Sequence, residues 1–299
     1  MRYRTLGRTG LKVSEIGFGA TPGVAANYVH AWDPRAPGSE AQIIDTLRYA
    51  VERGVNLFDT SQCYGDGHAE ELYGRGLEPL RDRVLIATKT DWRPGITEAE
   101  IDRRFEESLR RLRTDYVDVM QFHGDYDDRF TPDDVRWIIE GGPLDALKKL
   151  RAQGKVRYLG ITCEDAAPLV PLVESGEFDV IQVNYNLIYQ SAFHQLLPAC
   201  ERNNVGVLVM RPNTSGMFQK LLRAWDPRIE QQADLWALAL NFVLSDSRVT
   251  CALVGARSRA TVDKNIALSD DTSVRFDADW LHDRRVGDDR APKPWVQPD

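Results

Sequence analysis

Four side chains that can hold or move a proton stand at or just after short apolar runs of the chain: Asp59, Tyr64, Lys89 and His123. A phenol titrates near about 10 in isolation, so at neutral pH it is protonated but a slow acid. An ammonium beside it favours the phenolate and lowers that pKa, and a carboxylate keeps the ammonium charged and oriented. Asp59, Lys89 and Tyr64 therefore predict one proton-donating chain.

His123 completes the set, because an imidazole can hydrogen-bond a substrate oxygen and orient a carbonyl group. Each residue alone also has an ordinary structural explanation: a helix cap for Asp59, a solvent-exposed amine for Lys89, and a core hydrogen bond for His123. Coincidence is a poor explanation for all four at once. We therefore expect an acid–base site that acts on a carbonyl or alcohol carbon.

These side chains need a scaffold that brings successive strand ends together. Apolar runs of strand type alternate with helical periodicity, over residues 16–20, 55–58, 84–87, 117–122, 156–161, 180–183, 205–210 and 252–254. Several runs lack polar alternation, as expected of parallel strands covered on both faces. The opening segment has a glycine-containing turn between β-type residues, which predicts a hairpin.

The helices between these runs have recognisable starts. Ser39 with Gln42 and Thr97 with Glu100 predict capping boxes, and Pro143 suits a first helical turn. One apolar stripe at helical spacing is formed by Ile101, Phe105, Leu109 and Leu112.

Eight strands alternating with helices predict an α/β fold, a closed (β/α)8 TIM barrel with an N-terminal β-hairpin, whose active site lies at the carboxyl ends of the strands. An open doubly wound sheet is the rival, but it normally carries a G-x-G-x-x-G turn after its first strand. Pro22 interrupts any helix start at that point here. No linker divides the chain, so residues 1–299 are expected to form a single domain, with an irregular tail over 270–299 that can border the active site.

Composition excludes several function classes. A net charge of -7 argues against general affinity for nucleic acid or anionic membranes. No apolar stretch approaches the roughly 18 residues of a membrane span, and no leader segment is recognisable, so we expect a cytoplasmic protein. The four cysteines form no C-x-x-C pair, and the histidines at 30, 68 and 123 lack ligand spacing, so neither disulfides nor a metal site are expected.

At these residues the sequence resembles the aldo-keto reductase family. FDTSQCYGDGHAEELYGRGL resembles the family signature around its catalytic Asp and Tyr, ATKT carries the Lys, and DVMQFHG resembles the strand that carries the His. GKVRYLGIT, DVIQVNYN and CALVGARSRATVDKN resemble the later cofactor-binding segments, so the match extends to about residue 268. The resemblance implies the barrel fold, a nicotinamide cofactor without a dinucleotide-fold domain, and a catalytic tetrad at Asp59, Tyr64, Lys89 and His123.

The same resemblance implies the cofactor contacts. The nicotinamide carboxamide contacts fall on Thr162, Cys163 and Gln182, where the family usually has Ser-Asn in place of Thr162-Cys163. The remaining contacts are expected at Gly19, Ala20, Asp59, Met210, Arg211, Gly255, Arg257, Ser258 and Asn265. Met210 stands where many members place an aromatic ring on the nicotinamide, and a thioether packs there less rigidly. Arg211 reaches either a phosphate or substrate carboxylate, or forms a surface ion pair.

The loop from Gly255 opens a helix, a natural place for the adenosine 2′-phosphate of NADPH. NADPH-specific members often carry Lys at the Gly255 position and Arg at the Thr261 position, and both are missing here. Arg257 or Arg259 can substitute, so NADPH is slightly favoured over NADH. Asn265 matches a family residue that contacts the adenine.

Aromatic residues in the loops, chiefly Trp32, Trp92 and Tyr126, are expected to line the substrate site. The predicted function is reduction of a small-molecule aldehyde or ketone to an alcohol with Tyr64 as general acid. Two alternatives stay open: an NAD-dependent sugar or alcohol dehydrogenase running the reverse reaction, and a barrel that binds cofactor and senses redox state. Substrate identity and oligomeric state are not readable from the sequence.

Overall fold

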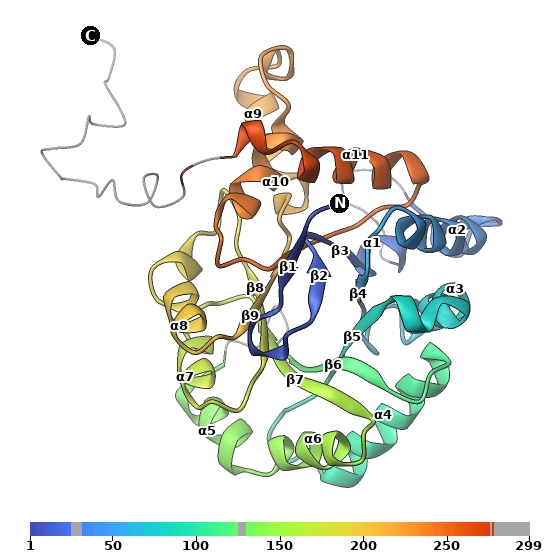
Figure 1. Ribbon diagram of the computed structural model, residues 1–299, viewed down its shortest axis with the longest axis vertical. Coiled ribbons are helices and arrows are strands. Elements are labelled where there is room, and N and C mark those ends of the chain that lie inside the picture. Colours follow the sequence, from blue (N-terminus) through green and yellow to red (C-terminus); the bar gives the residue numbers. More distant parts are fainter. Residues whose placement is uncertain (25–31, 125–129, 276, 278–299) are drawn as a thin grey trace, which may run out of the picture.

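The barrel predicted from the sequence is confirmed. The structure is a computed structural model that describes residues 1–24, 32–124, 130–275 and 277. Its eight parallel strands close in the order β10-β3-β4-β5-β6-β7-β8-β9, with helices around them (Figure 1). The barrel strands are β3 (Ile16–Gly19), β4 (Leu57–Asp59), β5 (Leu85–Thr90), β6 (Val117–His123), β7 (Val156–Cys163), β8 (Val180–Asn184), β9 (Gly206–Met210) and β10 (Cys251–Val254).

The predicted N-terminal hairpin is also confirmed. Strands β1 (Tyr3–Thr5) and β2 (Lys12–Ser14) pair antiparallel and lie across one end of the barrel (Figure 1). Leu6 and Val13 are fully buried among the apolar side chains of the barrel interior. Gly7 has a φ of +47°, and a Cβ there would lie 2.3 Å from the amide nitrogen of Gly206 at the start of β9. The hairpin therefore closes the amino-terminal end of the barrel, and its tight approach requires glycine.

The α-helices form the outer layer of the barrel. They are α1 (Thr21–Val24), α2 (Ser39–Glu52), α3 (His68–Leu77), α4 (Glu98–Leu112), α5 (Pro132–Glu140), α6 (Pro143–Ala152), α7 (Leu169–Glu174), α8 (Leu196–Arg202), α9 (Met217–Trp225), α10 (Leu235–Ser245) and α11 (Arg259–Asp270). Short 3-10 turns add Gly7–Thr9, Glu78–Arg83, Ser191–Phe193, Thr214–Gly216, Ile229–Gln231 and Thr272–Val274. Over the described ranges, none of these helices has both the length and the apolar character needed to cross a membrane.

The helix starts agree only in part with the sequence patterns. Half of the box predicted at Thr97 and Glu100 forms: the Thr97 side chain accepts a hydrogen bond from the amide of Glu100, but the Glu100 carboxylate pairs with Arg103 and Arg104. The predicted box at Ser39 and Gln42 is wrong, because Gly38 precedes α2 in the left-handed conformation (φ +87°) and makes no side-chain cap. A complete capping box instead begins α5, between Thr131 and Asp134.

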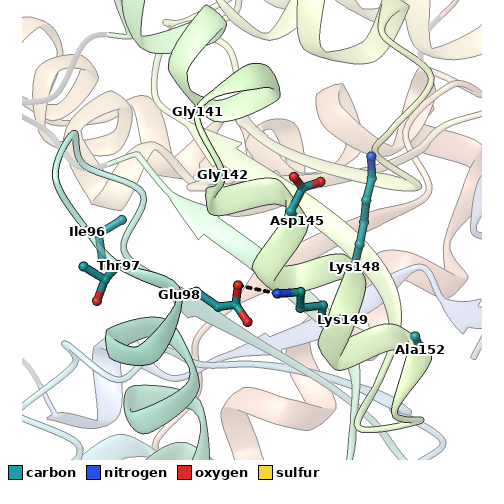
Figure 2. Close-up of a pocket in the computed structure, with 9 residues that line it drawn as sticks. All are labelled: Ile96, Thr97, Glu98, Gly141, Gly142, Asp145, Lys148, Lys149 and Ala152. Carbon is teal, nitrogen blue, oxygen red and sulfur yellow. Dashed lines mark hydrogen bonds and ion pairs between the residues drawn. The ribbon is translucent and has the colours of Figure 1, made fainter.

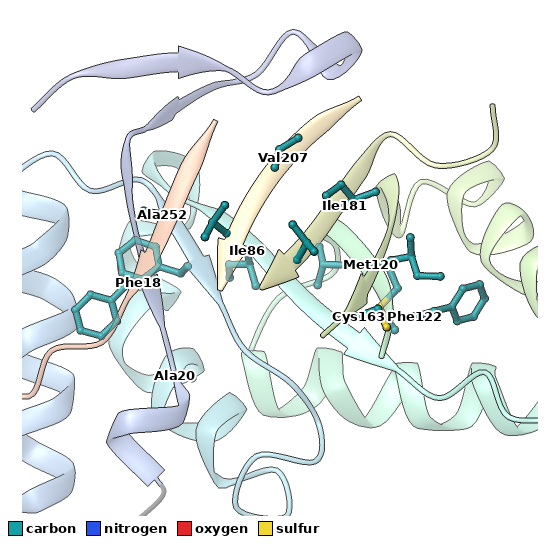
Figure 3. Close-up of a cluster of buried hydrophobic side chains, with 14 of the residues drawn as sticks. Phe18, Ala20, Ile86, Met120, Phe122, Cys163, Ile181, Val207 and Ala252 are labelled. Atoms are coloured by element: carbon teal, nitrogen blue, oxygen red, sulfur yellow. The ribbon is translucent and has the colours of Figure 1, made fainter. Parts of the chain in front are cut away.

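Strand alternation divides the buried side chains into two clusters. One fills the barrel interior, with residues such as Leu57, Ala87, Val119 and Leu208. The other lies between the strands and the helices and is drawn in Figure 3, where Met120, Phe122, Cys163 and Ile181 belong to it. Residues that share the parity of the interior cluster, including Asp59, Lys89, Gln121 and His123, therefore face the barrel axis.

Candidate active site

Asp59 and Lys89 form a buried ion pair at the carboxyl ends of β4 and β5. The Lys89 Nζ lies 2.8 and 2.7 Å from the two carboxylate oxygens of Asp59, and donates to the carbonyl oxygen of Thr60 at 2.7 Å. Lys89 is 0% and Asp59 is 3% exposed. Burial alone lowers the pKa of Lys89, but the Asp59 carboxylate outweighs it, and the pKa stands above its usual value. The amine therefore stays charged inside the barrel.

Two glutamines hold Asp59 from the other side: Gln121, which was not among the predicted site residues, and Gln182, which was predicted only as a nicotinamide contact. Gln121 Nε2 donates to Asp59 Oδ1 at 3.2 Å, and Gln182 Nε2 approaches Oδ2 at 3.5 Å. Both glutamines are buried. Gln121 lies two residues before His123 on β6, so strand alternation was the signal that places it on the same face.

Tyr64 is partly buried and lies above this pair, in the loop after β4. The Lys89 Nζ is 5.1 Å from the centre of the Tyr64 ring, and the His123 ring centre is 5.7 Å from it in an edge-on arrangement. The four residues of the predicted tetrad are therefore brought together at one mouth of the barrel.

The net effect on Tyr64 is opposite to the lowering expected from the sequence. Burial raises the pKa of the Tyr64 phenol above its ordinary value. The Lys89 ammonium acts in the expected direction and lowers this pKa, while Asp59 partly cancels the lysine. Burial wins, because desolvation penalises the phenolate. Tyr64 is therefore a fully protonated acid at neutral pH.

His123 is oriented by a small polar cluster. Its Nδ1 lies 3.3 Å from the Ser61 hydroxyl and 3.4 Å from the Cys63 sulfur, and those two groups are 3.2 Å apart. Ser61 is buried, whereas Cys63 is exposed. Neither Ser61 nor Cys63 was expected to contact His123. The contacts fix which side of the imidazole faces the loop and which side faces the barrel mouth.

The predicted substrate residues have different surroundings. Trp92 is 3% exposed, its indole donates to the His123 carbonyl oxygen at 3.0 Å, and its ring packs edge-on against Phe130 at 4.6 Å. Trp92 thus supports the end of the histidine strand and offers little open surface to a substrate. Trp32 is partly buried, and its indole donates to the Gly23 carbonyl oxygen at 2.9 Å. Tyr126 lies outside the described residues.

Of the residues predicted to contact the nicotinamide, Thr162 and Gln182 lie on the interior face of the barrel strands. Thr162 and Gln182 are register partners on β7 and β8, both are buried, and the Gln182 Oε1 accepts no hydrogen bond from any described residue. A carboxamide NH2 is the kind of donor that such an acceptor needs, so these two residues fit a nicotinamide. The Met210 sulfur lies 4.0 Å from the Thr162 hydroxyl, at the same rim.

Cys163 does not fit the role expected for its side chain. It alternates with Thr162 on β7, so it faces the helix layer, where it is buried in the outer apolar cluster (Figure 3). Burial raises the pKa of its thiol to about 11. The predicted contact between the Cys163 side chain and a nicotinamide is therefore wrong, because side chains alternate along β7 and this one points away from the barrel interior.

Arg211 forms an ion pair, which is one of the two roles that the sequence predicts for it. Its Nε lies 3.0 Å from the Glu164 carboxylate, and both side chains are about one-quarter exposed. Asn184 donates to the other oxygen of Glu164 at 2.8 Å. Arg211 is thus bound to a carboxylate beside the mouth of the barrel.

The start of α11 has the geometry of an anion site. Ser258 caps the helix by accepting from the Thr261 amide. Arg259 is paired with Asp45 at 2.8 and 2.5 Å, whereas the Arg257 guanidinium lies 5.0 Å from the centre of the Trp32 ring. Within the described part of the chain Arg257 has no carboxylate partner.

The other expected cofactor residues lie at strand ends or on α11. Gly19 is the register partner of Asp59, and the amide of Ala20 donates to the Asp59 carbonyl oxygen at 2.9 Å. Gly255 follows β10, and Asn265 is buried on α11.

Two cavities lie near the strand ends or the helices. One of about 390 Å³ adjoins the tetrad and includes Cys63, Thr90 and His123 in its lining. The other, of about 630 Å³, lies between the start of α4 and the length of α6 and is shown in Figure 2. It is bordered by the Glu98–Lys149 ion pair and contains none of the predicted site residues. Of the tetrad, His123 lines the first cavity, which extends toward α4 through Arg103, Arg104 and Arg111.

Comparisons with known proteins agree with this geometry. The model of the Aldo/keto reductase family matches residues 25–230. The chain is 31% identical to an L-galactose dehydrogenase from Arabidopsis thaliana, over 89% of this chain and 88% of the relative. It is 28% identical to an NADH-specific methylglyoxal reductase from Escherichia coli, over 89% and 93%. An aldo/keto reductase from Klebsiella pneumoniae, solved with NADP and acetate, superposes with a TM-score of 0.71 at 26% identity, over 94% and 93% of the two chains. The chain therefore belongs to the aldo-keto reductase family and is an oxidoreductase that uses a nicotinamide cofactor.

Proposed function

We propose that this enzyme reduces a small aldehyde or ketone to the alcohol, with Tyr64 as the proton donor. The observation that carries the proposal is the position of the Tyr64 ring, whose centre lies 5.1 Å from the buried Lys89 ammonium and 5.7 Å from the centre of the His123 ring. NADPH or NADH, when bound, supplies the hydride to the carbonyl carbon.

Each residue of the tetrad then has one task. Tyr64 gives its proton to the carbonyl oxygen, and Lys89 stabilises the phenolate that remains. Asp59 keeps Lys89 charged in a site where burial would otherwise neutralise it. His123 holds the carbonyl oxygen within reach of the phenol, and Ser61 fixes the imidazole in place.

Oxidation of an alcohol or sugar is the second candidate. It is favoured by the similarity to an L-galactose dehydrogenase, which is 31% identical. In that direction Tyr64 must begin as the phenolate, and burial opposes this form. At neutral pH the protonated phenol is the form that carbonyl reduction needs.

The test uses purified protein and the Tyr64→Phe variant. Titration with NADPH and NADH, followed by nucleotide fluorescence, measures cofactor binding, and a panel of small aldehydes and ketones measures turnover. The variant should bind the cofactor like the wild type and lose reduction by about 100- to 10,000-fold, the usual contribution of a general acid. Reduction by the variant at the wild-type rate would exclude Tyr64 as the donor. Absence of binding by the wild type would exclude the cofactor site itself.

Several expectations from the sequence stay predictions. They include the folding of residues 1–299 as one domain, the individual cofactor and substrate contacts, a cytoplasmic location, and the absence of nucleic-acid and membrane partners. The charge of -7 supports the last of these.

A further inference from the structure

The cluster beside Tyr64 contains a nucleophile that carbonyl reduction does not use. Cys63 is exposed, and its sulfur lies 3.4 Å from His123 Nδ1 and 3.2 Å from the Ser61 hydroxyl. The Cys63 amide also donates to the Ser61 hydroxyl at 3.4 Å, which holds the backbone of the loop in place. A thiol in contact with an imidazole can pass its proton to the ring and become the reactive thiolate.

The cavity of about 390 Å³ at this thiol has an unused hydrogen-bonding group. Thr90, at the end of β5, lines the cavity together with Cys63 and His123. Its side chain is 1% exposed, and its hydroxyl makes no hydrogen bond to any described residue. A buried polar group without a partner is costly, so this hydroxyl is poised for a polar ligand. The thiol, the imidazole and the hydroxyl line one cavity, and Cys63 directly precedes the proton donor Tyr64 in the chain.

We propose that Cys63 is a covalent capture site for α,β-unsaturated aldehydes and ketones that enter the mouth of the barrel. The carbonyl oxygen of such a compound accepts a hydrogen bond from Tyr64, and the sulfur of Cys63 forms a bond to the β-carbon. The electron pair of the C=C bond moves to the α-carbon and carbonyl oxygen as an enolate. His123 takes the thiol proton and returns it to the α-carbon, so every atom of the acceptor is kept and no further reagent is consumed.

This reaction rests on the carbonyl-binding role of Tyr64 in the proposed function, and it needs no nicotinamide. Adduct formation can therefore be measured without cofactor. Reduction is measured separately, with a saturated ketone and cofactor.

The first experiment incubates the cofactor-free protein with methyl vinyl ketone at neutral pH and locates the adduct by peptide mass spectrometry. The chain supplies three matched controls, because Cys163, Cys200 and Cys251 are buried and burial raises the pKa of each thiol, to about 11 for Cys163 and about 12 for Cys200. We expect one adduct, on Cys63, and none in the Cys63→Ser variant. Labelling of the three buried cysteines at the rate of Cys63 would overturn the proposal.

The second experiment separates capture at a carbonyl site from simple exposure of a thiol. Methyl methanethiosulfonate modifies thiols but has no carbonyl group, so it reports the accessibility of Cys63 alone. Tyr64→Phe should slow addition of the ketone at least about tenfold, because it removes the acid that stabilises the enolate. The same variant should leave the methanethiosulfonate rate within about twofold, because the thiol and imidazole are retained. Equal slowing of both reagents, or of neither, would overturn the proposal.

The two proposals can fail separately. An enzyme that reduces a saturated ketone through Tyr64 but shows no Tyr64-dependent adduct would keep the proposed function and lose the capture site. An enzyme that forms the Tyr64-dependent adduct but reduces nothing would keep the capture site and lose the proposed function.

Discussion

Replacing Lys89 with methionine should leave the buried Asp59 carboxylate without a charged partner inside the barrel. The methionine side chain keeps much of the packing, but among the described residues the Asp59 carboxylate then has only the amides of Gln121 at 3.2 Å and Gln182 at 3.5 Å. Burial already raises the pKa of Asp59, and the lysine that opposes this rise is gone. The cost of the stranded charge is limited, since the carboxyl can take up a proton instead.

The free energy of protonating Asp59 therefore sets the largest expected loss of stability. A carboxyl with an unfolded pKa of about 3.9 costs about 4 kcal/mol to protonate at pH 7, and about 1.5 kcal/mol at pH 5. The reference is the double variant Lys89→Met/Asp59→Asn, which buries no charge. We expect Lys89→Met to be less stable than this double variant by close to these amounts, because the two remaining hydrogen bonds are long.

The sign of the pH dependence follows from the raised pKa. A group whose pKa is higher in the folded state contributes fully to stability below its unfolded pKa and loses that contribution as the pH rises from there through the folded pKa. The two variants should therefore have equal stability near pH 4 and diverge by about 1.4 kcal/mol per pH unit above it.

Urea denaturation of both variants from about pH 4 to about pH 7 measures the difference, with turnover measured in parallel. The double variant should be stable and yet lose reduction by at least about 100-fold, because no ammonium remains beside Tyr64. Equal stability of the two variants at pH 7, or a difference that does not change with pH, would refute the picture of Asp59 as a charge held by Lys89.

Two further predictions concern Tyr64 and the cofactor. Because burial raises the pKa of Tyr64, kcat/KM for reduction should stay level from about pH 6 to about pH 9, whereas alcohol oxidation should rise with pH as the phenolate forms; a loss of reduction through neutral pH would contradict this. Arg257→Ala should weaken NADPH binding about tenfold or more in a fluorescence titration, while NADH binding changes little, because a charge-assisted bond to the 2′-phosphate is lost. Arg259→Ala is the matched control, since its guanidinium is held by Asp45; equal effects of the two substitutions would contradict the assignment.

Much of the fold and of the tetrad could be predicted because both depend on local patterns. The apolar runs mark the strands, and the parallel barrel then places Asp59, Lys89 and His123 at one end. The alternation of side chains along a strand also predicts which of two neighbouring residues faces the barrel axis. Thr162 and Cys163 are neighbours on β7, so both cannot face the barrel axis, and Gln121 shares the parity of His123.

Other features depend on contacts between distant segments and could not be read from the sequence. The pairing of Arg259 with Asp45 joins residues 214 positions apart. The Gln42 side chain donates to the Arg257 carbonyl oxygen, and not to the backbone at the start of α2 as the predicted capping box requires. The pKa of Tyr64 is decided by burial, which a sequence pattern does not measure.

The hairpin of β1 and β2 has a consequence for the order of events at the site. With Leu6 and Val13 closing the amino-terminal end and the interior cluster filling the barrel, the site faces the carboxyl ends of the strands. Molecules that bind there enter and leave by the same side of the barrel. A molecule seated against the strand ends is therefore held until the one above it departs, so the last to arrive is the first to leave.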